Sequence, residues 1–359
     1  MNDQVINKEK ILNLIWQIAQ IKRKGIKITL VSSGAINAGV HIMNLTERPQ
    51  TIPEKQALAA IGQASLMQIY EDLFSLFDLK CAQILLNHDD FDDRKRLMNF
   101  NHALQALIKY DVVPIINEND TLAVDEIKVG DNDTLASLIV PAVDADMVVL
   151  VSDIDGLYDD NPHTNKDAKL IRDVNGITSE IENMAKDASS KVGTGGMVTK
   201  IKAAKVCNDY GCAMAIVNGS KENVLVDLLN GQDVGTYFNG DVGRKLSARE
   251  HWIMYRSMPK GKIIVDTGAK KALVNNHSSL LPKGIIDVTG NFLISQIVDI
   301  VDENDNLLAR GIVNYSSDEI KLIKGLNTSE IENILNYKDY DEIVHANNLV
   351  LVEGVKNND

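Results

Sequence analysis

The sequence predicts an α/β protein with a mainly parallel sheet covered by helices on both faces, followed by a small β-rich second domain. Strand-like and helix-like segments alternate through about residue 217, and most strand-like segments are continuous apolar runs, as in buried parallel strands. Beyond about residue 260, short β-type runs broken by glycine and polar residues follow one another. A length of 359 residues has room for about two domains.

The segments of the first domain follow from hydrophobic spacing and from the residues that stop helices. Ile11, Leu14 and Ile18 lie three or four residues apart, as on one face of a helix, and Gly25 closes that segment. A β-rich run over 26–31 comes next. Further helices are predicted over 53–77, 91–110, 134–143 and 197–210, and further strands over 81–86, 112–116, 147–151 and 213–217.

The second domain is predicted from a change of pattern. The first domain is expected to span 1–240, and a charged, poorly periodic connector 241–257. The β-rich domain is expected over 258–337, and a C-terminal tail over 338–359. Its strands are predicted at 263–265, 285–288, 294–301 and 307–313, with a hairpin turn at 301–306.

Composition excludes several classes of function. The net charge of -13 argues against broad electrostatic binding to nucleic acid or to an anionic membrane. No apolar run approaches the ~20 residues of a membrane span, and the N-terminus does not resemble a signal peptide. Three cysteines are too few for a disulfide framework, so they are expected to be buried packing residues in a protein of the reducing cytoplasm.

In parallel sheets, ligands bind where the carboxyl ends of strands meet loops, which makes 32–35, 117–133, 152–158 and 193–196 the candidate loops. In the last of these, glycines precede a helix whose first turn carries Lys200. Free backbone amides and a cation at that point suit a phosphate. The segment matches no standard phosphate-binding motif, and an ordinary flexible turn is an equally good interpretation.

The segment 117–133 carries six acids and three asparagines after a buried strand. Such groups can bind an ammonium group, hold Mg²⁺ or orient a lysine, and their density favours function over turns and helix caps. The loop 32–35 fits either an anion site or a capped helix start. For Ser152 and Asp153, a plain turn is favoured over the border of a nucleotide base.

One acidic cluster is interpreted structurally. The segment 88–93 contains a histidine and four aspartates and resembles a metal site. It lies where a helix is expected to begin, and acids are stabilised at the positive end of a helix dipole. We therefore predict that these side chains serve the starts of helices.

Four segments together resemble the glutamate 5-kinases of the amino acid kinase superfamily: 31–36, 116–120, 127–133 and 193–197. Near the C-terminus, 279–285 and 288–292 look like a PUA domain. The resemblance runs from about Ile6 to past Tyr337. It implies the three-layer αβα amino acid kinase fold, with a mainly parallel sheet, plus a small β-rich PUA domain.

The resemblance also implies an activity: transfer of the γ-phosphate of ATP to the side-chain carboxylate of L-glutamate, the first step of proline synthesis. Catalysis would involve Lys200 and Asp133, with Mg²⁺ accompanying ATP and no separate metal site. Asp131 is a weaker candidate for orienting the cation. Glutamate would be bound by Ser33, Asp120 and Asn132. ATP would be bound by Ser152, Asp153, Thr194, Gly195, Gly196, Met197, Val198, Thr199 and Lys200.

Several expectations about partners come from the same resemblance. The family suggests a homo-oligomer, dimer or tetramer, feedback inhibition by proline, and glutamyl phosphate reductase as a partner. RNA binding through the PUA domain is an alternative, but residues 259–337 carry 8 basic and 10 acidic side chains, which disfavours it. No membrane partner is expected.

The sequence departs from the family at its start. Family members begin with a strand and a loop of the form K-x-G-[ST]-S that touches the ATP phosphates. Here Met1 falls just before the first predicted helix. The kinase domain is therefore expected to lack the usual first strand and to leave neighbouring backbone groups exposed. A catalytically impaired, truncated kinase is a further alternative.

Overall fold

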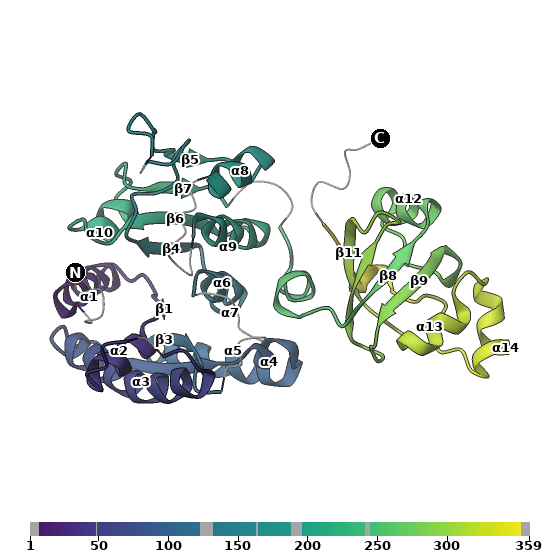
Figure 1. Cartoon of the computed structure of the whole chain (residues 1–359), viewed down its shortest axis with the longest axis horizontal. Coiled ribbons are helices and arrows are strands. Elements are labelled where there is room, and N and C mark those ends of the chain that lie inside the picture. Colours follow the sequence, from purple (N-terminus) through teal and green to yellow (C-terminus); the bar gives the residue numbers. More distant parts are fainter. Residues whose placement is uncertain are drawn as a thin grey trace. The chain divides into compact units, whose positions relative to one another are not determined.

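The computed structural model describes residues 7–47, 49–122, 132–162, 164–187, 196–240 and 245–352. The chain divides into two units, Met1–Lys245 and Leu246–Asp359, each with its own hydrophobic core (Figure 1). The limit between the units falls inside the segment that the sequence indicates as a connector. The predicted domain limits stay predictions.

Helices and strands alternate along the described part of unit 1 (Figure 1). The helices are α1 (Lys8–Arg23), α2 (Ala35–Ile42), α3 (Ile52–Ser75), α4 (His88–Asp92), α5 (Arg94–Lys109), α6 (Asn132–Leu138), α7 (Val140–Val143), α8 (Ser179–Asp187), α9 (Met197–Tyr210) and α10 (Val224–Leu229). The strands are β1 (Leu30–Val31), β2 (Cys81–Leu86), β3 (Val113–Glu118), β4 (Met147–Ser152), β5 (Asp173–Val174), β6 (Ala213–Asn218) and β7 (Thr236–Phe238).

The first sheet of unit 1 is fully parallel, with the order β1-β3-β2. Its central strand β3 is an apolar run and is buried, as expected for a parallel strand covered on both faces. Ile115 of β3 packs in one core with Ile15 of α1 and with Leu66 and Phe74 of α3. The sequence-predicted helix–strand alternation therefore gives a core that holds α1 and α3 against β3.

The second sheet of unit 1 has the order β4-β6-β7-β5, with β6 and β7 antiparallel and the other pairs parallel. Met214 and Ile216 of β6 pack in one core with residues of α9. The alternate residues Ala215 and Val217 pack with residues of α10. Because alternate residues of a strand point to opposite faces, helices cover this sheet on both sides. The predicted three-layer α/β fold with mainly parallel strands is confirmed.

One short helix connects these two sheets. α6 contacts β1 and β3 of the first sheet, β4 of the second sheet, and α9. Within the described residues β1 and β4 are edge strands of their sheets. The N-terminal end of α6 therefore lies where residues from both halves of unit 1 can meet.

The helices α2 and α3 approach each other at two glycines. A Cβ atom placed on Gly62 would lie 1.8 Å from the carbonyl oxygen of Ala35, and one on Gly39 would lie 2.0 Å from that of Leu58. Both distances are far shorter than any van der Waals contact, so the two backbones touch directly. This contact fixes the start of α2, which follows the loop 32–34, against α3.

Unit 2 is built on a five-stranded sheet of order β12-β11-β10-β8-β9, in which only β8 and β10 are parallel. The predicted turn between β10 and β11 is confirmed: Asp302 Oδ1 accepts hydrogen bonds from the backbone N–H groups of Asn304 and Asn306, both at 3.0 Å. Burial by itself raises the pKa of Asp302. The hydrogen bonds from Lys270 and Asn306 outweigh the effect of burial, and the pKa of Asp302 falls to about 2. The strands are β8 (Gly261–Val265), β9 (Ile285–Gly290), β10 (Ile297–Val301), β11 (Leu307–Ile312) and β12 (Leu349–Leu351).

Short helices complete unit 2, and three of them, α12, α13 and α14, contribute residues to its main core. α13 contacts β9 and α14. The segment predicted as a C-terminal tail contributes β12, which pairs with β11. The helices are α11 (Ala248–His251), η2 (Trp252–Arg256), α12 (Thr267–Asn276), η3 (Pro282–Gly284), α13 (Ser317–Ile323), η4 (Thr328–Glu330), α14 (Ile331–Leu335) and η5 (Ala346–Asn348).

Two sequence-predicted strands are longer than the observed ones. The run predicted over 26–31 pairs only at Leu30 and Val31, and the strand predicted from 294 begins at Ile297. Residues 26–29 include Lys27 and stay partly exposed, so their β propensity finds no strand partner in the described residues.

Two of the three cysteines are buried, as the sequence predicts. Cys207 and Cys212 are buried in the core beside α9, Cys81 is half-buried, and all three are free thiols. A hydrogen bond with Cys212 and burial raise the pKa of Cys207 well above its ordinary value. The thiol of Cys207 is therefore a packing group with little thiolate character.

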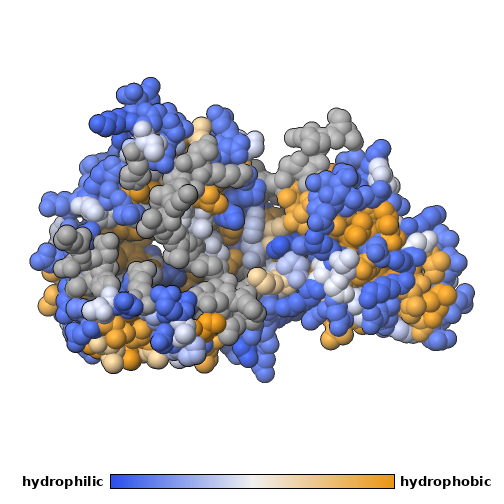
Figure 2. Space-filling model, in the orientation of Figure 1, coloured by the Kyte–Doolittle hydropathy of each residue, from blue (hydrophilic) through white to orange (hydrophobic). Residues whose placement is uncertain are grey.

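The surface of unit 1 is mixed, with hydrophobic side chains gathered over α2 and α3 (Figure 2). They include the exposed side chains of Ile42, Met43, Leu45 and Ile61. Within the described residues, the helices are all too short or too polar to cross a lipid bilayer.

We expect Gly62→Ala to destabilise unit 1 by about 3 kcal/mol, because the added methyl group forces α2 and α3 apart and overpacked sites cost ~1–3 kcal/mol or more. Urea unfolding followed by circular dichroism measures this loss. The matched control is Gly268→Ala in α12, where the nearest atom to a new Cβ is 3.3 Å away. Equal midpoints for the two variants would show that the α2–α3 contact is not tight.

Candidate functional site

The N-terminal end of α6 brings together two groups of polar side chains. Its first two residues, Asn132 and Asp133, are neighbours in sequence but contact different parts of unit 1. Asn132 faces the loop after β1 and the end of β3, and Asp133 faces the first turn of α9. The segment before α6, including Asp131, lies outside the described residues.

Asp133 and Lys200 form an ion pair with little exposure to solvent. Lys200 Nζ donates to Asp133 Oδ2 at 2.8 Å, and the two side chains are 10% and 18% exposed. Thr199 Oγ1 also contacts Asp133 Oδ2, at 3.3 Å. Charges at such depth require partners, because an unpaired buried charge costs several kcal/mol. The pair therefore fixes both side chains at the border of α6 and α9.

Asn132 anchors the loop that follows β1. Its Nδ2 donates to the carbonyl oxygen of Ser32 at 2.5 Å and to Oδ1 of Asn117 at 3.3 Å. Ser33 is the next residue of that loop and is exposed. Gly34 then takes a left-handed conformation with φ of 101°, which allows the chain to turn directly into α2. Ser33 and Asn132, both predicted as glutamate-binding residues, therefore belong to one connected group.

Three residues of this group were not predicted from the sequence as site residues. Asn117 Nδ2 donates to Gln63 Oε1 at 3.1 Å, and the hydroxyl groups of Tyr70 and Ser32 lie 2.9 Å apart. Burial raises the pKa of Tyr70, although the hydrogen bond with Ser32 works in the opposite direction. Asn117 lies in the acid- and amide-rich segment already noted. Gln63 and Tyr70 read as ordinary residues of a long helix, so no local signal marks them.

Asp120, the third predicted glutamate-binding residue, lies in a turn just after β3 and is partly exposed. The end of β3 places it on the same strand terminus as Asn117. The backbone N–H of Asn119 donates to the carbonyl oxygen of Leu86 at the end of β2, which continues the strand pairing up to this turn. The acid- and amide-rich segment that begins at Asn117 therefore starts at the carboxyl end of the central strand β3.

A second polar group lies at the paired ends of β4 and β6. Ser152 is opposite Asn218 in the strand register, and Ser152 Oγ donates to Asp153 Oδ1 at 3.2 Å. Asn218 Nδ2 donates to the carbonyl oxygen of Asp153 at 3.4 Å and to Asp155 Oδ1 at 2.8 Å. Hydrogen bonds from Lys221 and Asn218 hold the pKa of Asp155 below its ordinary value. Asn218 was missed because one asparagine at a strand end carries no motif.

The predicted ATP-binding segment is described only from Gly196 onward. Thr194 and Gly195 lie outside the described residues. Gly196 is the N-cap of α9, and its carbonyl oxygen accepts a hydrogen bond from Thr199 Oγ1 at 2.8 Å. Met197 is buried and Val198 is half-buried. Lys200 therefore occupies the first turn of α9, as the sequence indicates.

The residues around Lys200 and those around Asn132 can bind different parts of a ligand, one an anion and the other an ammonium group. The first turn of α9 places the N-terminal backbone of a helix together with a lysine, which suits a phosphate. Lys200 has three donors, and one is used by Asp133. Around Asn132, amide and carboxylate oxygens provide acceptors for an ammonium group. Because Asn132 and Asp133 are adjacent, both binding chemistries meet at the start of α6.

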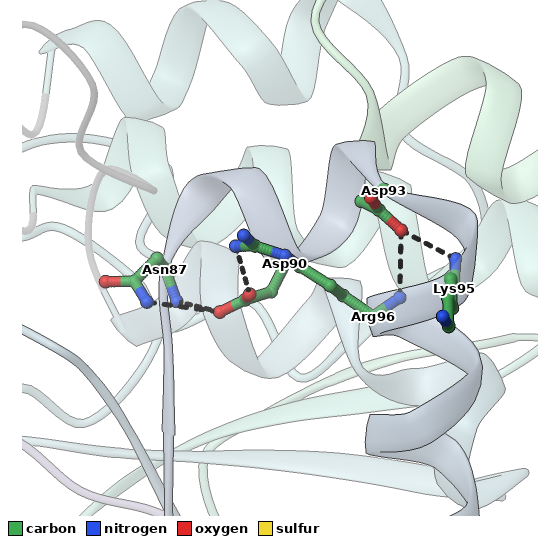
Figure 3. Close-up of polar contacts among 5 residues, drawn as sticks. All are labelled: Asn87, Asp90, Asp93, Lys95 and Arg96. Carbon is green, nitrogen blue, oxygen red and sulfur yellow. Dashed lines mark hydrogen bonds and ion pairs between the residues drawn. The ribbon is translucent and has the colours of Figure 1, made fainter.

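The acidic segment 88–93 serves helix starts, as predicted (Figure 3). Asp90 Oδ2 accepts from the backbone N–H of Asn87 at 2.7 Å, in a capping box at the start of α4. Asp93 Oδ1 accepts from the backbone N–H groups of Lys95 and Arg96 at the start of α5. These bonds lower the pKa of Asp93. Across the described part of the chain, histidine, cysteine and acidic side chains form no cluster suited to a metal ion.

Comparison with known proteins identifies the two regions of the chain. Residues 4–218 match the amino acid kinase family, and residues 261–335 match the PUA domain. A solved structure, carbamate kinase from Giardia lamblia bound to AMP-PNP, is similar over 67% of this chain and 94% of that chain, with 14% identity and a TM-score of 0.48.

Curated relatives cover nearly the whole chain. The Glutamate 5-kinase of Thermoanaerobacter sp. (strain X514) is 47% identical over 348 residues, which cover 97% of this chain and 93% of the relative. The Glutamate 5-kinase of Dictyoglomus thermophilum is 45% identical over 345 residues, which cover 96% and 92%. The resemblance noted in the sequence is confirmed: the chain belongs to the amino acid kinase family, among its glutamate 5-kinases, and carries a PUA domain after the kinase region.

Proposed function

We propose that the protein transfers the γ-phosphoryl group of ATP to the side-chain carboxylate of L-glutamate, giving γ-glutamyl phosphate and ADP in the first step of proline synthesis. The relatives named above carry this activity in their name. The observation that supports it most directly is the position of Asn132 and Asp133. One helix start contacts both the loop of Ser33 and the lysine of α9.

Glutamate is held by the group around Asn132. Ser33 and the neighbouring amides suit a carboxylate, while Asp120 and the amide oxygen of Asn132 suit the α-ammonium group. The side-chain carboxylate then extends toward Asp133 and Lys200. ATP is bound by Ser152, Asp153 and the segment from Thr194 to Lys200, with its phosphates at the first turn of α9.

The reacting carboxylate is already a nucleophile, so no general base is needed. One of its oxygens attacks the γ-phosphorus, the bond between that phosphorus and the β–γ bridging oxygen breaks, and ADP leaves. The difficulty is to bring two anions together and to stabilise the charge of the transferring group. Lys200 supplies positive charge there, and its bond with Asp133 fixes where that charge lies.

Mg²⁺ accompanies ATP in this proposal. The contacts of Asp133 with Lys200 and Thr199 both use Oδ2, which leaves Oδ1 to meet the cation directly or through water. When bound, the cation neutralises phosphate charge. Asp133 therefore has two roles, one toward Lys200 and one toward the nucleotide.

The wider setting follows from the same proposal. The acyl phosphate product is reactive toward nucleophiles, so a reductase that consumes it, glutamyl phosphate reductase, is the fitting partner. The family expectation of a dimer or tetramer and a cytoplasmic location stay predictions.

Trapping the product tests the proposal. With L-glutamate, ATP, Mg²⁺ and hydroxylamine, the protein should form γ-glutamyl hydroxamate and ADP in equal amounts. L-Aspartate, which is one methylene shorter, should react far more slowly because its carboxylate does not reach the same point. ADP release without hydroxamate, or equal turnover of aspartate, would contradict the proposed substrate.

We expect Lys200→Ala to lower kcat by about 100-fold or more while the KM for glutamate changes little, because Lys200 acts on charge in the transition state. The hydroxamate assay measures both constants. Lys202→Ala, an exposed lysine of the same helix, is the matched control and should behave as the unmodified protein. A normal kcat for Lys200→Ala would remove this residue from the mechanism.

We expect Asn218→Ala to raise the KM for ATP about tenfold, with a much smaller effect on the KM for glutamate. Asn218 joins the carbonyl oxygen of Asp153 to the carboxylate of Asp155, and losing a bond to a charged group costs ~1.5–3 kcal/mol. Steady-state kinetics with each substrate varied separately measures the split. Asn230→Ala, which loses an exposed contact with Lys24, is the control.

A further inference from the structure

A directed chain of hydrogen bonds runs from α3 to Asn132. Gln63 Oε1 accepts from Asn117 Nδ2 at 3.1 Å, and Asn117 Oδ1 accepts from Asn132 Nδ2 at 3.3 Å. Asn132 Nδ2 also donates to the carbonyl oxygen of Ser32. Asn117 is 3% exposed, so its amide must find partners inside the protein.

The carbonyl of Ser32 determines which way these amides point. A carbonyl oxygen can only accept, so the nitrogen of the Asn132 amide has to face it. Both protons of that nitrogen are then used, one by Ser32 and one by Asn117. The oxygen of the Asn132 amide is consequently turned away from these partners, as an acceptor. The acceptor on Gln63 closes the chain by fixing the amide of Asn117.

A second contact from the same helix holds the same loop. Gln63 and Tyr70 are seven residues apart on α3, which places them on one face two turns from each other. The hydroxyl groups of Tyr70 and Ser32 lie 2.9 Å apart, and both residues are nearly buried, at 9% and 5% exposure. Burial raises the pKa of Tyr70, so the phenol keeps its proton and its hydrogen bond at neutral pH.

We propose that Gln63 and Tyr70 are positioning residues for glutamate, which act through Ser32, Asn117 and Asn132 without contacting the substrate. They hold the amide of Asn132 with its oxygen toward the α-ammonium group and hold the loop that carries Ser33. This inference rests on the proposed function. It makes recognition of the ammonium group depend on a helix whose residues read, in sequence, as packing residues.

Two variants test the proposal first, in the hydroxamate assay. Tyr70→Phe and Gln63→Leu should each raise the KM for glutamate about tenfold, while kcat and the KM for ATP change about twofold or less. Glutarate, which is glutamate without the ammonium group, gives the sharper readout. The ratio of kcat/KM for glutamate to that for glutarate should fall about tenfold in Gln63→Leu, because the misplaced amide of Asn132 no longer binds the ammonium group.

Gln63→Glu separates positioning from packing. The carboxylate introduced by Gln63→Glu keeps an acceptor for Asn117. This variant should therefore retain a higher affinity for the substrate L-glutamate than Gln63→Leu. If Gln63 only fills space, the apolar leucine should be tolerated better than a half-buried charge, and the order of the two variants reverses. That reversal, or an unchanged glutamate-to-glutarate ratio in Gln63→Leu, would overturn the proposal.

Tyr315→Phe is the matched control for Tyr70→Phe. Tyr315 is buried in unit 2, and its hydroxyl group donates to the carbonyl oxygen of Tyr340 at 2.5 Å. This control should lower the unfolding temperature and leave the KM for glutamate unchanged. If the unmodified protein forms no hydroxamate, the proposed function fails. If it does and Tyr70→Phe has the same KM, the proposed function stands and the positioning role fails.

Discussion

The ion pair between Lys200 and Asp133 is the interaction on which the site depends. Lys200 is on α9, which packs on the second sheet, and Asp133 is on α6, which also contacts the first sheet. At 10% and 18% exposure, neither charge can be left without its partner at low cost. The pair therefore fixes Lys200 relative to α6, which also contacts β1 and β3 of the first sheet.

Asn132 is the residue before Asp133 and links the ion pair to the first sheet. The peptide bond between Asn132 and Asp133 joins the hydrogen-bonded amides that start at Gln63 to the ion pair with Lys200, so both groups of contacts share the start of α6. The direct backbone contact at Gly62, next to Gln63, holds α3 against the start of α2. This packing holds the helix that carries Gln63 beside the loop that carries Ser32.

The sequence predicted the fold well where the pattern is local. Continuous apolar runs predicted β2, β3, β4 and β6 because parallel strands are buried on both faces. The short helices α8 and α10 and the strands β5 and β7 were not predicted, since each depends on tertiary packing more than on its own residues. Asn132 and Asp133 lie in the acid-rich segment, and their site roles were implied by the family resemblance. The roles of the predicted site residues stay predictions, and Thr194, Gly195 and Asp131 also lie outside the described residues.

Gln63 and Tyr70 show why some residues of the candidate site could not be predicted from the sequence. Both belong to a helix of 24 residues whose pattern is explained by packing alone, and their partners are 54 and 38 residues away in the chain. No local motif records a hydrogen bond between such distant residues. The hydrogen bonds also show which way the side-chain amides point. The carbonyl oxygen of Ser32 can only accept, so the amide nitrogen of Asn132 has to face it. A site of this kind is therefore specified by the long helix as much as by the loops that line it.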